Sequence, residues 1–163
     1  RLRCDWSSDV CSSDLEAQAL VDTSALGNPR RVAVGFDQNR LSMLLAILHR
    51  HGGLQVGDQD VFVNAVGGIR VEETGSDLAL ILAIVSSFRD RALPLDLVCF
   101  GELGLSGEIR PVPNGQERLR EAAKHGFKTA IVPEANKPRQ DVVGLKIVAV
   151  RKLSDALAAV ESL

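Results

Sequence analysis

The sequence LALILAIVSSF, from Leu78 to Phe88, is the most apolar element of the chain. Apolar side chains surround almost the whole helical projection, which predicts a buried helix, because a surface helix keeps a polar face toward water. After Pro94 the sequence LDLVCF, from Leu95 to Phe100, is typical of a buried strand. A buried helix joined to a buried strand by a short link indicates a layered α/β domain.

The flanking sequence continues the alternation of strands and helices. Asp37 precedes apolar residues at helical spacing, and Gly52-Gly53 ends that pattern, which predicts a capped helix between them. The sequence GELGLSGEIRPV indicates a hairpin that turns at Leu105-Ser106-Gly107. Further strands are expected at 16–22, 31–36, 60–66, 129–132 and 146–150, and further helices at 116–125 and 154–160.

The composition is that of a globular domain. The chain has 163 residues, of which 45% are hydrophobic and 25% charged, with a net charge of −2. This charge excess is too small to indicate a generic nucleic-acid protein, and 4% aromatic residues without tyrosine argue against a stacking platform for single strands. The longest apolar run falls short of the ~20 residues that span a bilayer. With no secretory signal, we expect a cytoplasmic protein without membrane contact.

The first fifteen residues, RLRCDWSSDVCSSDL, differ from the rest of the chain. The stretch from Asp5 to Leu15 matches the translation of a common sequencing adapter, so we expect residues 1–15 to be a disordered assembly artefact. A Ser/Asp-rich linker is the alternative. Residues 16–163 then form the domain, and we expect it to be a C-terminal fragment of a longer protein. Its single cysteine, Cys99, is predicted to be a small core residue in a reducing compartment.

Several motifs of cofactor chemistry are absent from residues 16–163. The sequence has no G-x-x-x-x-G-K-[ST], no C-x-x-C and no H-E-x-x-H. His49 and His51 are two residues apart on a predicted helix and therefore point to different faces. We expect no metal site and no cofactor in this chain.

Ser76 is the hydroxyl group with a candidate chemical role. It stands at the start of the buried helix, where backbone N–H groups could hold an oxyanion beside a nucleophile. The alternative is that Ser76, like Thr74, caps this helix. The local sequence by itself favours the cap.

The residues from Val61 to Pro138 resemble the C-terminal Lon-protease-like domain of the RadA (Sms) family of bacterial DNA repair proteins. The resemblance extends over essentially all of residues 16–163, and the segment GEIRPVPNGQERL is similar to the Lon stretch that carries the second catalytic residue. It implies the α/β fold of ribosomal protein S5 domain 2.

The resemblance places the Lon-type serine on Ser76 and the Lon-type lysine on Arg118. A lysine can be tuned by burial to a pKa of about 7–8 and then take a proton from serine, whereas arginine stays charged. We therefore expect both positions to be vestigial and the chain to lack enzyme activity. Arg118 is expected to pair with Glu117, Glu121, a neighbouring subunit or a phosphate, while Lys124 and Lys128 are the candidates for a relocated base.

The family's properties imply an assembly and DNA-interaction domain of a DNA-dependent ATPase in recombinational repair and branch migration. They imply a ring, hexameric in this family, DNA and the recombinase RecA as partners, and ATP, Mg²⁺ and Zn²⁺ bound only by domains upstream of this fragment. The alternative is a Ser–Lys peptidase domain of an ATP-dependent Lon-type protease. The candidate DNA-contacting residues are Arg30, Arg31, Arg40, Arg50, Arg139, Arg151 and Lys152.

Overall fold

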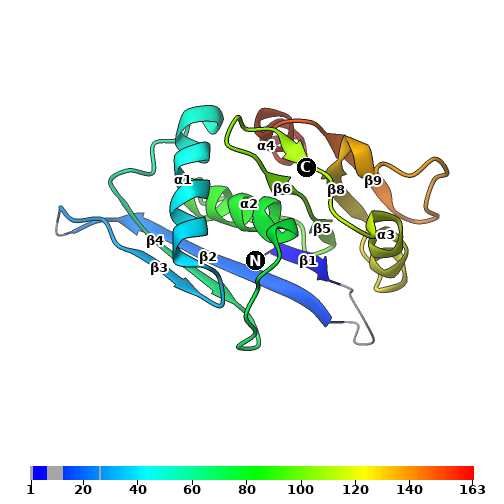
Figure 1. Ribbon diagram of the computed structural model, residues 1–163, viewed down its shortest axis with the longest axis horizontal. Helices are drawn as coiled ribbons and strands as arrows, with labels where there is room; N and C mark the ends of the chain where they lie inside the picture. The colour runs from blue at the N-terminus through cyan, green and yellow to red at the C-terminus, as the bar shows by residue number, and fades with distance from the viewer. Residues whose placement is uncertain (1, 7–12, 26) are drawn as a thin grey trace.

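The fold is built on a seven-stranded mixed sheet (Figure 1). The computed structural model describes residues 2–6, 13–25 and 27–163. The strand order is β3-β4-β2-β1-β5-β8-β9; β2 is antiparallel to β1 and β4, and all other neighbours are parallel. The strands are β1 (Leu2–Trp6), β2 (Ser13–Thr23), β3 (Arg31–Val34), β4 (Gln59–Ala65), β5 (Leu97–Cys99), β8 (Thr129–Pro133) and β9 (Lys146–Val150).

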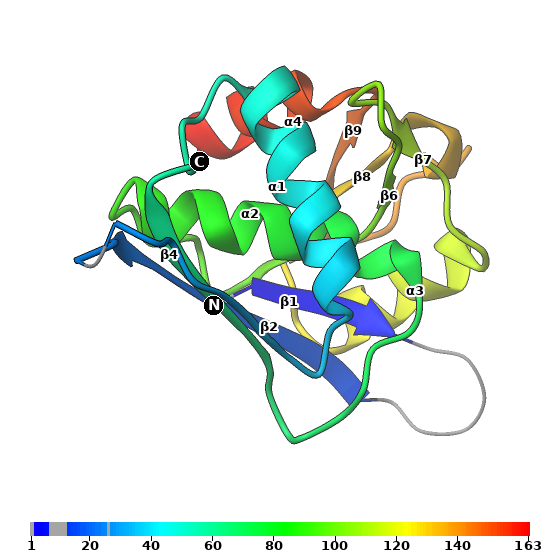
Figure 2. The ribbon, with the colours of Figure 1, turned by 60° about the vertical axis from the view of Figure 1, so that its left-hand side comes forward.

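Four α-helices in the described residues accompany the sheet, and the predicted mixed α/β class is confirmed (Figure 2). They are α1 (Gln38–Gly52), α2 (Asp77–Phe88), α3 (Gly115–Lys124) and α4 (Leu153–Glu161), with short 3-10 helices η1 (Thr74–Ser76) and η2 (Glu134–Asn136). The predicted hairpin is confirmed as β6 (Glu102–Leu103) and β7 (Ile109–Arg110). No helix of the described residues is long and apolar enough to cross a membrane.

Helix α2 forms the centre of the core, as its composition predicts. Every residue from Leu78 to Val85 is at most 2% exposed. The helix contacts β1, β2, β4 and β5 and also α1. Full burial of a large aliphatic side chain contributes about 1.5–3 kcal/mol, so this helix supplies a large part of the hydrophobic free energy of folding.

The two halves of the sheet differ in how they are covered. Strand β5 is buried at every residue, including Cys99 as predicted, and β8 is buried after Thr129. Burial alternates along β3 and β4, because α1 and α2 lie on one face of this half (Figure 2). The other face of β2, β3 and β4 carries no helix of the described residues.

The expectation that residues 1–15 are disordered is wrong for their described part. Strand β1 lies between β2 and β5, with five registered pairs to β2 and the pair Arg3↔Val98 to β5. The sequence LRCDW alternates apolar and charged residues, a period-two pattern that is typical of a strand. Backbone pairing on both sides then holds it in the sheet. Residues 7–12 lie outside the described residues, and the adapter origin stays a prediction.

Candidate functional site

Ser76 lies where the chain passes from η1 into α2. Its side chain is buried, and its hydroxyl donates a hydrogen bond to the backbone carbonyl of Glu73 at 3.0 Å. Ser76 occupies the N-cap position of α2, as the alternative expects, but its side chain makes no capping hydrogen bond to the helix. Among the described residues no lysine is hydrogen-bonded to this hydroxyl.

Arg118 is a fully buried guanidinium facing the same segment. Its side chain is 1% exposed; Nη2 donates to Glu73 Oε1 at 2.7 Å and Nε donates to the Pro113 carbonyl at 3.0 Å. The guanidinium carbon also lies 5.9 Å from the centre of the Phe100 ring. The expected partners Glu117 and Glu121 are therefore wrong, because Glu73, 45 positions away, takes that role.

A second buried ion pair adjoins the first. Asp77, at 2% side-chain exposure, accepts from Arg40 Nε at 3.0 Å, from Arg40 Nη2, and from the backbone N–H of Leu103 at 3.0 Å. Burial raises the pKa of Asp77, and the hydrogen bonds from Arg40 and Leu103 oppose that rise. Arg40 therefore bonds a buried carboxylate, and its assignment as a DNA-contacting residue stays a prediction.

Glu73 of the first ion pair and both residues of the second line a cavity of about 290 Å³. Its lining includes Phe36, Arg40, Arg70, Glu73, Ser76 and Asp77. Each buried charge here has an opposite charge bonded to it, and no lining residue is a lysine or histidine. The cavity can thus hold polar groups. The bases that line it are carboxylates, and the Ser76 hydroxyl bonds the backbone carbonyl of Glu73 rather than any of them.

The two lysines that the sequence offers as relocated bases lie outside the cavity that contains Ser76. Lys124 is 70% exposed and its Nζ bonds Glu121 Oε1 at 2.6 Å on the surface of α3. Lys128 is exposed at the start of β8. Neither lysine lines the cavity that contains Ser76.

Arg30 and Arg31 are held locally at the start of β3. Arg30 bonds the Asp60 carboxylate through its backbone N–H at 2.7 Å and through its guanidinium at 3.0 Å, above the Phe62 ring. The Arg30 backbone N–H is the main reason why the pKa of Asp60 is lowered. This stabilisation is present above the ordinary aspartate value and is lost as the pH falls through the lowered one. Arg31 donates to the carbonyl groups of Val56, in the loop before β4, and of Gln59, at the start of β4.

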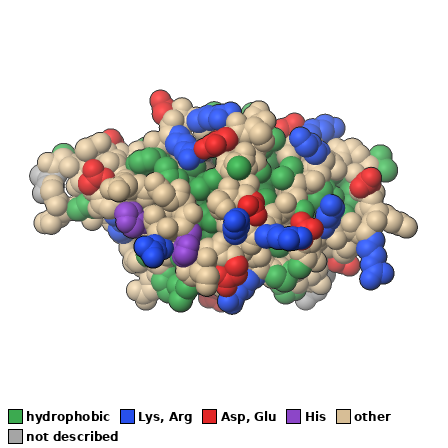
Figure 3. Space-filling view, turned by 90° about the horizontal axis from the view of Figure 1, so that it is seen from above, with side chains coloured by type: hydrophobic (Ala, Val, Ile, Leu, Met, Phe, Trp, Pro, Cys, Tyr) green, Lys and Arg blue, Asp and Glu red, His purple; other side chains and the backbone are tan. Residues whose placement is uncertain are grey.

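The remaining predicted cations are exposed. Arg50 lies in the last turn of α1, Arg151 and Lys152 lie between β9 and α4, and Arg139 lies in the loop before β9. Charges of both signs are interspersed on the face that Figure 3 presents.

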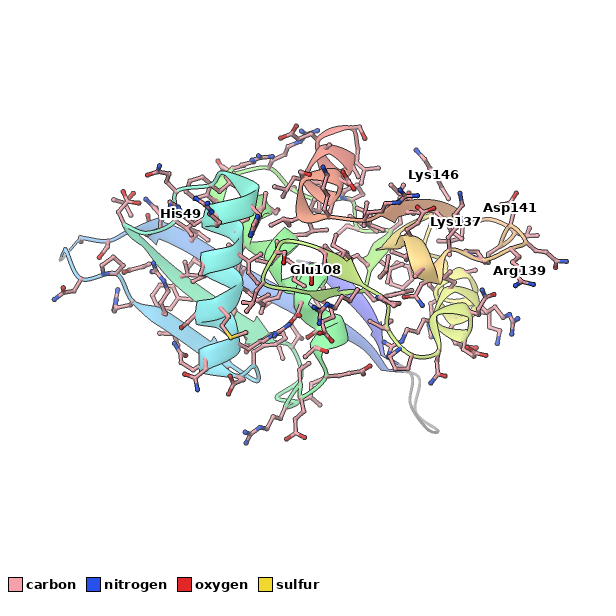
Figure 4. All side chains as sticks on the ribbon, turned by 45° about the horizontal axis from the view of Figure 1, so that its top comes forward. His49, Glu108, Lys137, Arg139, Asp141 and Lys146 are labelled. Atoms are coloured by element: carbon pink, nitrogen blue, oxygen red, sulfur yellow. The ribbon has the colours of Figure 1, made fainter. Side chains whose placement is uncertain are left out.

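Arg139 has two basic neighbours that sequence reasoning missed. Lys137 and Lys146 project with it at the β9 end of the molecule, beside Asp141 (Figure 4). We call Lys137, Arg139 and Lys146 the β9-end cluster. All three are exposed, and none forms an ion pair with another described residue. Lys137 and Arg139 are two positions apart in the sequence, which could have indicated a basic pair. Lys146 comes close to them only in the folded chain.

The described residues contain no group of three or more His, Cys, Asp and Glu side chains that could hold a metal ion. His49 and His51 do not converge on a common ligand position. His51 Nε2 lies 3.0 Å from the carbonyl oxygen of Leu105 and so joins α1 to the tip of the hairpin.

Comparison with known proteins places this chain in a family. The family model described as subunit ChlI of Mg-chelatase matches residues 18–136, and the chain belongs to this family. The chain is similar to proteins called DNA repair protein RadA: 67% identical to those of Haemophilus influenzae and Escherichia coli and 42% to that of Bacillus subtilis, each over 149 residues. These alignments cover 91%, 91% and 88% of this chain. The chain spans about a third of these curated relatives, 32%, 32% and 31%.

Proposed function

We propose that this chain is a non-proteolytic, Lon-like domain with the fold of ribosomal protein S5 domain 2, working in a DNA repair protein. The observation that carries the proposal is Arg118, a buried arginine bonded to Glu73 and Pro113 at the position that the resemblance assigns to the catalytic lysine. The relatives' name, DNA repair protein, supports the biological setting.

The chemistry argues against the alternative, a Ser–Lys peptidase. A serine nucleophile requires a neighbouring group that can accept its proton near neutral pH. A guanidinium cannot do so, and the Ser76 hydroxyl donates instead to a backbone carbonyl, which is not a general base. Ser76 is therefore a structural hydroxyl that ties α2 to the preceding loop.

We expect the protein to release no fluorophore from quenched peptide or casein substrates beyond a no-protein blank. Ser76→Ala should give the same trace, because no described group activates the hydroxyl. Arg118→Lys tests whether the guanidinium is the sole obstacle; it should also be inactive, since Glu73 would hold the ammonium as an ion pair. Hydrolysis by the natural chain that disappears in Ser76→Ala would contradict the proposal.

The role that remains is assembly and contact with DNA. We propose that the domain aligns subunits in a hexameric ring and that the β9-end cluster contacts phosphates. The further candidates for phosphate contact are Arg30, Arg31, Arg40, Arg50, Arg151 and Lys152. Weak contacts repeated around a ring axis add, so isolated cations suffice. ATP, Mg²⁺ and Zn²⁺ would belong to other parts of the protein, because this sequence has no P-loop or paired-cysteine motif in residues 16–163. RecA stays a proposed partner.

Reversing the β9-end cluster, with Lys137→Glu, Arg139→Glu and Lys146→Glu together, is expected to weaken duplex DNA binding at least about tenfold. Each phosphate contact adds about 0.9 to the slope of log affinity against log salt, so the slope should fall by about 2–3. Fluorescence anisotropy across a salt series measures both quantities.

The matched control reverses Arg70, Arg89 and Arg110 to glutamate. These arginines already sit in surface ion pairs, and the change in net charge is identical. Equal losses of binding in the two triple variants would assign the effect to net charge and would remove the β9-end cluster as a DNA contact.

A further inference from the structure

Strand β3 forms one edge of the seven-stranded sheet. It is hydrogen-bonded to β4 on one side, in the parallel register Arg31↔Val61 to Val34↔Asn64. The Arg30 carbonyl accepts a hydrogen bond from the Val61 backbone N–H. In a parallel pair, the backbone groups of every second residue point toward the neighbouring strand. The backbone N–H and C=O groups of Arg31 and Ala33 therefore point away from β4, toward the open edge. An open edge of this kind is a template for pairing with another strand.

One side chain occupies this edge. Gln38 Oε1 accepts from the Ala33 backbone N–H at 3.1 Å, and Gln38 Nε2 donates to the Arg31 carbonyl at 2.6 Å. A primary amide presents one acceptor and one donor, as the peptide group of an added strand would. Gln38 begins α1, where Asp37 Oδ1 accepts from Arg40 N at 2.7 Å and fixes the turn.

The sheet face next to this edge is apolar and uncovered. Val32 and Val34 on β3 are 39% and 54% exposed, and Leu20 on β2 is 59% exposed. With Phe62 these side chains line a shallow groove on the face that carries no helix of the described residues. An exposed apolar strand at an open edge is a typical site of unwanted strand addition.

We propose that the Gln38 carboxamide closes the β3 edge against strand addition, and that the strand it excludes is β3 of a second copy of this chain. Two β3 strands related by a two-fold axis would pair antiparallel, each offering the same outward groups of Arg31 and Ala33. Such pairing would also join the two apolar faces. This inference is independent of the proposed function.

Gln38→Ala tests the proposal in the full chain. Exchange of the Ala33 amide hydrogen, followed by NMR, should become about fivefold faster at low protein concentration, because one backbone partner is lost. At higher concentration, analytical ultracentrifugation should detect dimers at about a tenfold lower concentration than for the natural sequence. Gln55→Ala, a change at another exposed glutamine, should alter neither measurement.

A second variant identifies the edge that pairs. Adding Ala33→Pro to Gln38→Ala removes the backbone donor, so the dimers should disappear, because proline cannot take part in an edge ladder. Unchanged exchange at Ala33, unchanged association in Gln38→Ala, or dimers that survive Ala33→Pro would each overturn the proposal.

Discussion

Replacing Arg118 with methionine is expected to lower the free energy of unfolding by about 3–5 kcal/mol. The variant keeps much of the side-chain volume but removes the charge. The carboxylate of Glu73 and the carbonyl of Pro113 would lose the donors that now lie 2.7 and 3.0 Å away. Urea unfolding followed by circular dichroism measures the change.

Arg120→Met is the control, because Arg120 is an exposed arginine on the same helix. A surface substitution of this kind changes stability by about 0.5 kcal/mol or less. Arg118→Lys should fall between the two, since an ammonium keeps the charge but lacks the planar fork that bonds Glu73 and Pro113 together. If Arg118→Met and Arg120→Met unfold at the same urea concentration, the buried ion pair does not have the structural role assigned to it.

Replacing Arg40 with alanine should be equally damaging at neutral pH, by about 3–5 kcal/mol, because it leaves Asp77 as a buried carboxylate without a counter-charge. Burial already raises the pKa of Asp77 above 3.8, and removal of Arg40 would raise it further. When the pKa of a group is higher in the folded state than in the unfolded state, its contribution to stability is fully present below the unfolded-state pKa. That contribution is lost as the pH rises through the folded-state pKa. The deficit of Arg40→Ala should therefore shrink on acidification toward about pH 4.

Urea unfolding of both proteins between neutral pH and pH 4 checks this expectation. The double variant Arg40→Ala with Asp77→Asn is the matched comparison, because it has no buried charge to compensate. The double variant should be more stable than Arg40→Ala at neutral pH. Its loss of unfolding free energy relative to the natural sequence should also vary less with pH. A deficit of Arg40→Ala that stays constant over the whole range would exclude an ionised Asp77 as its cause.

Local sequence patterns predicted most elements because burial and period are linked. The apolar run at Leu78–Phe88 became the central helix, and the hairpin at Leu105-Ser106-Gly107 formed where glycine permits the turn. Strand β1 has the same kind of period-two pattern, although the composition of residues 1–15 is unusual. Period-two alternation outweighed composition there, since a strand is defined by its backbone pairing.

The sequence identified two residues of the candidate site but not the contacts that they make. Ser76 and Arg118 were identified from the sequence, while their common neighbour Glu73 was not. Arg40 was identified from the sequence as a cation, but its carboxylate partner was not. Asp77 lies 37 positions from Arg40, and nothing local marks the two as a pair.

The amino-acid order alone thus determined the layered α/β class, the buried helix and the arginine at position 118, since these depend on periodicity and residue chemistry. Only the tertiary structure decided which charges neutralise one another, which cations stay exposed, and how Gln38 meets the edge of β3. Those outcomes depend on Coulombic and hydrogen-bond contacts that act over a few ångströms, and chain folding sets such distances independently of separation along the sequence.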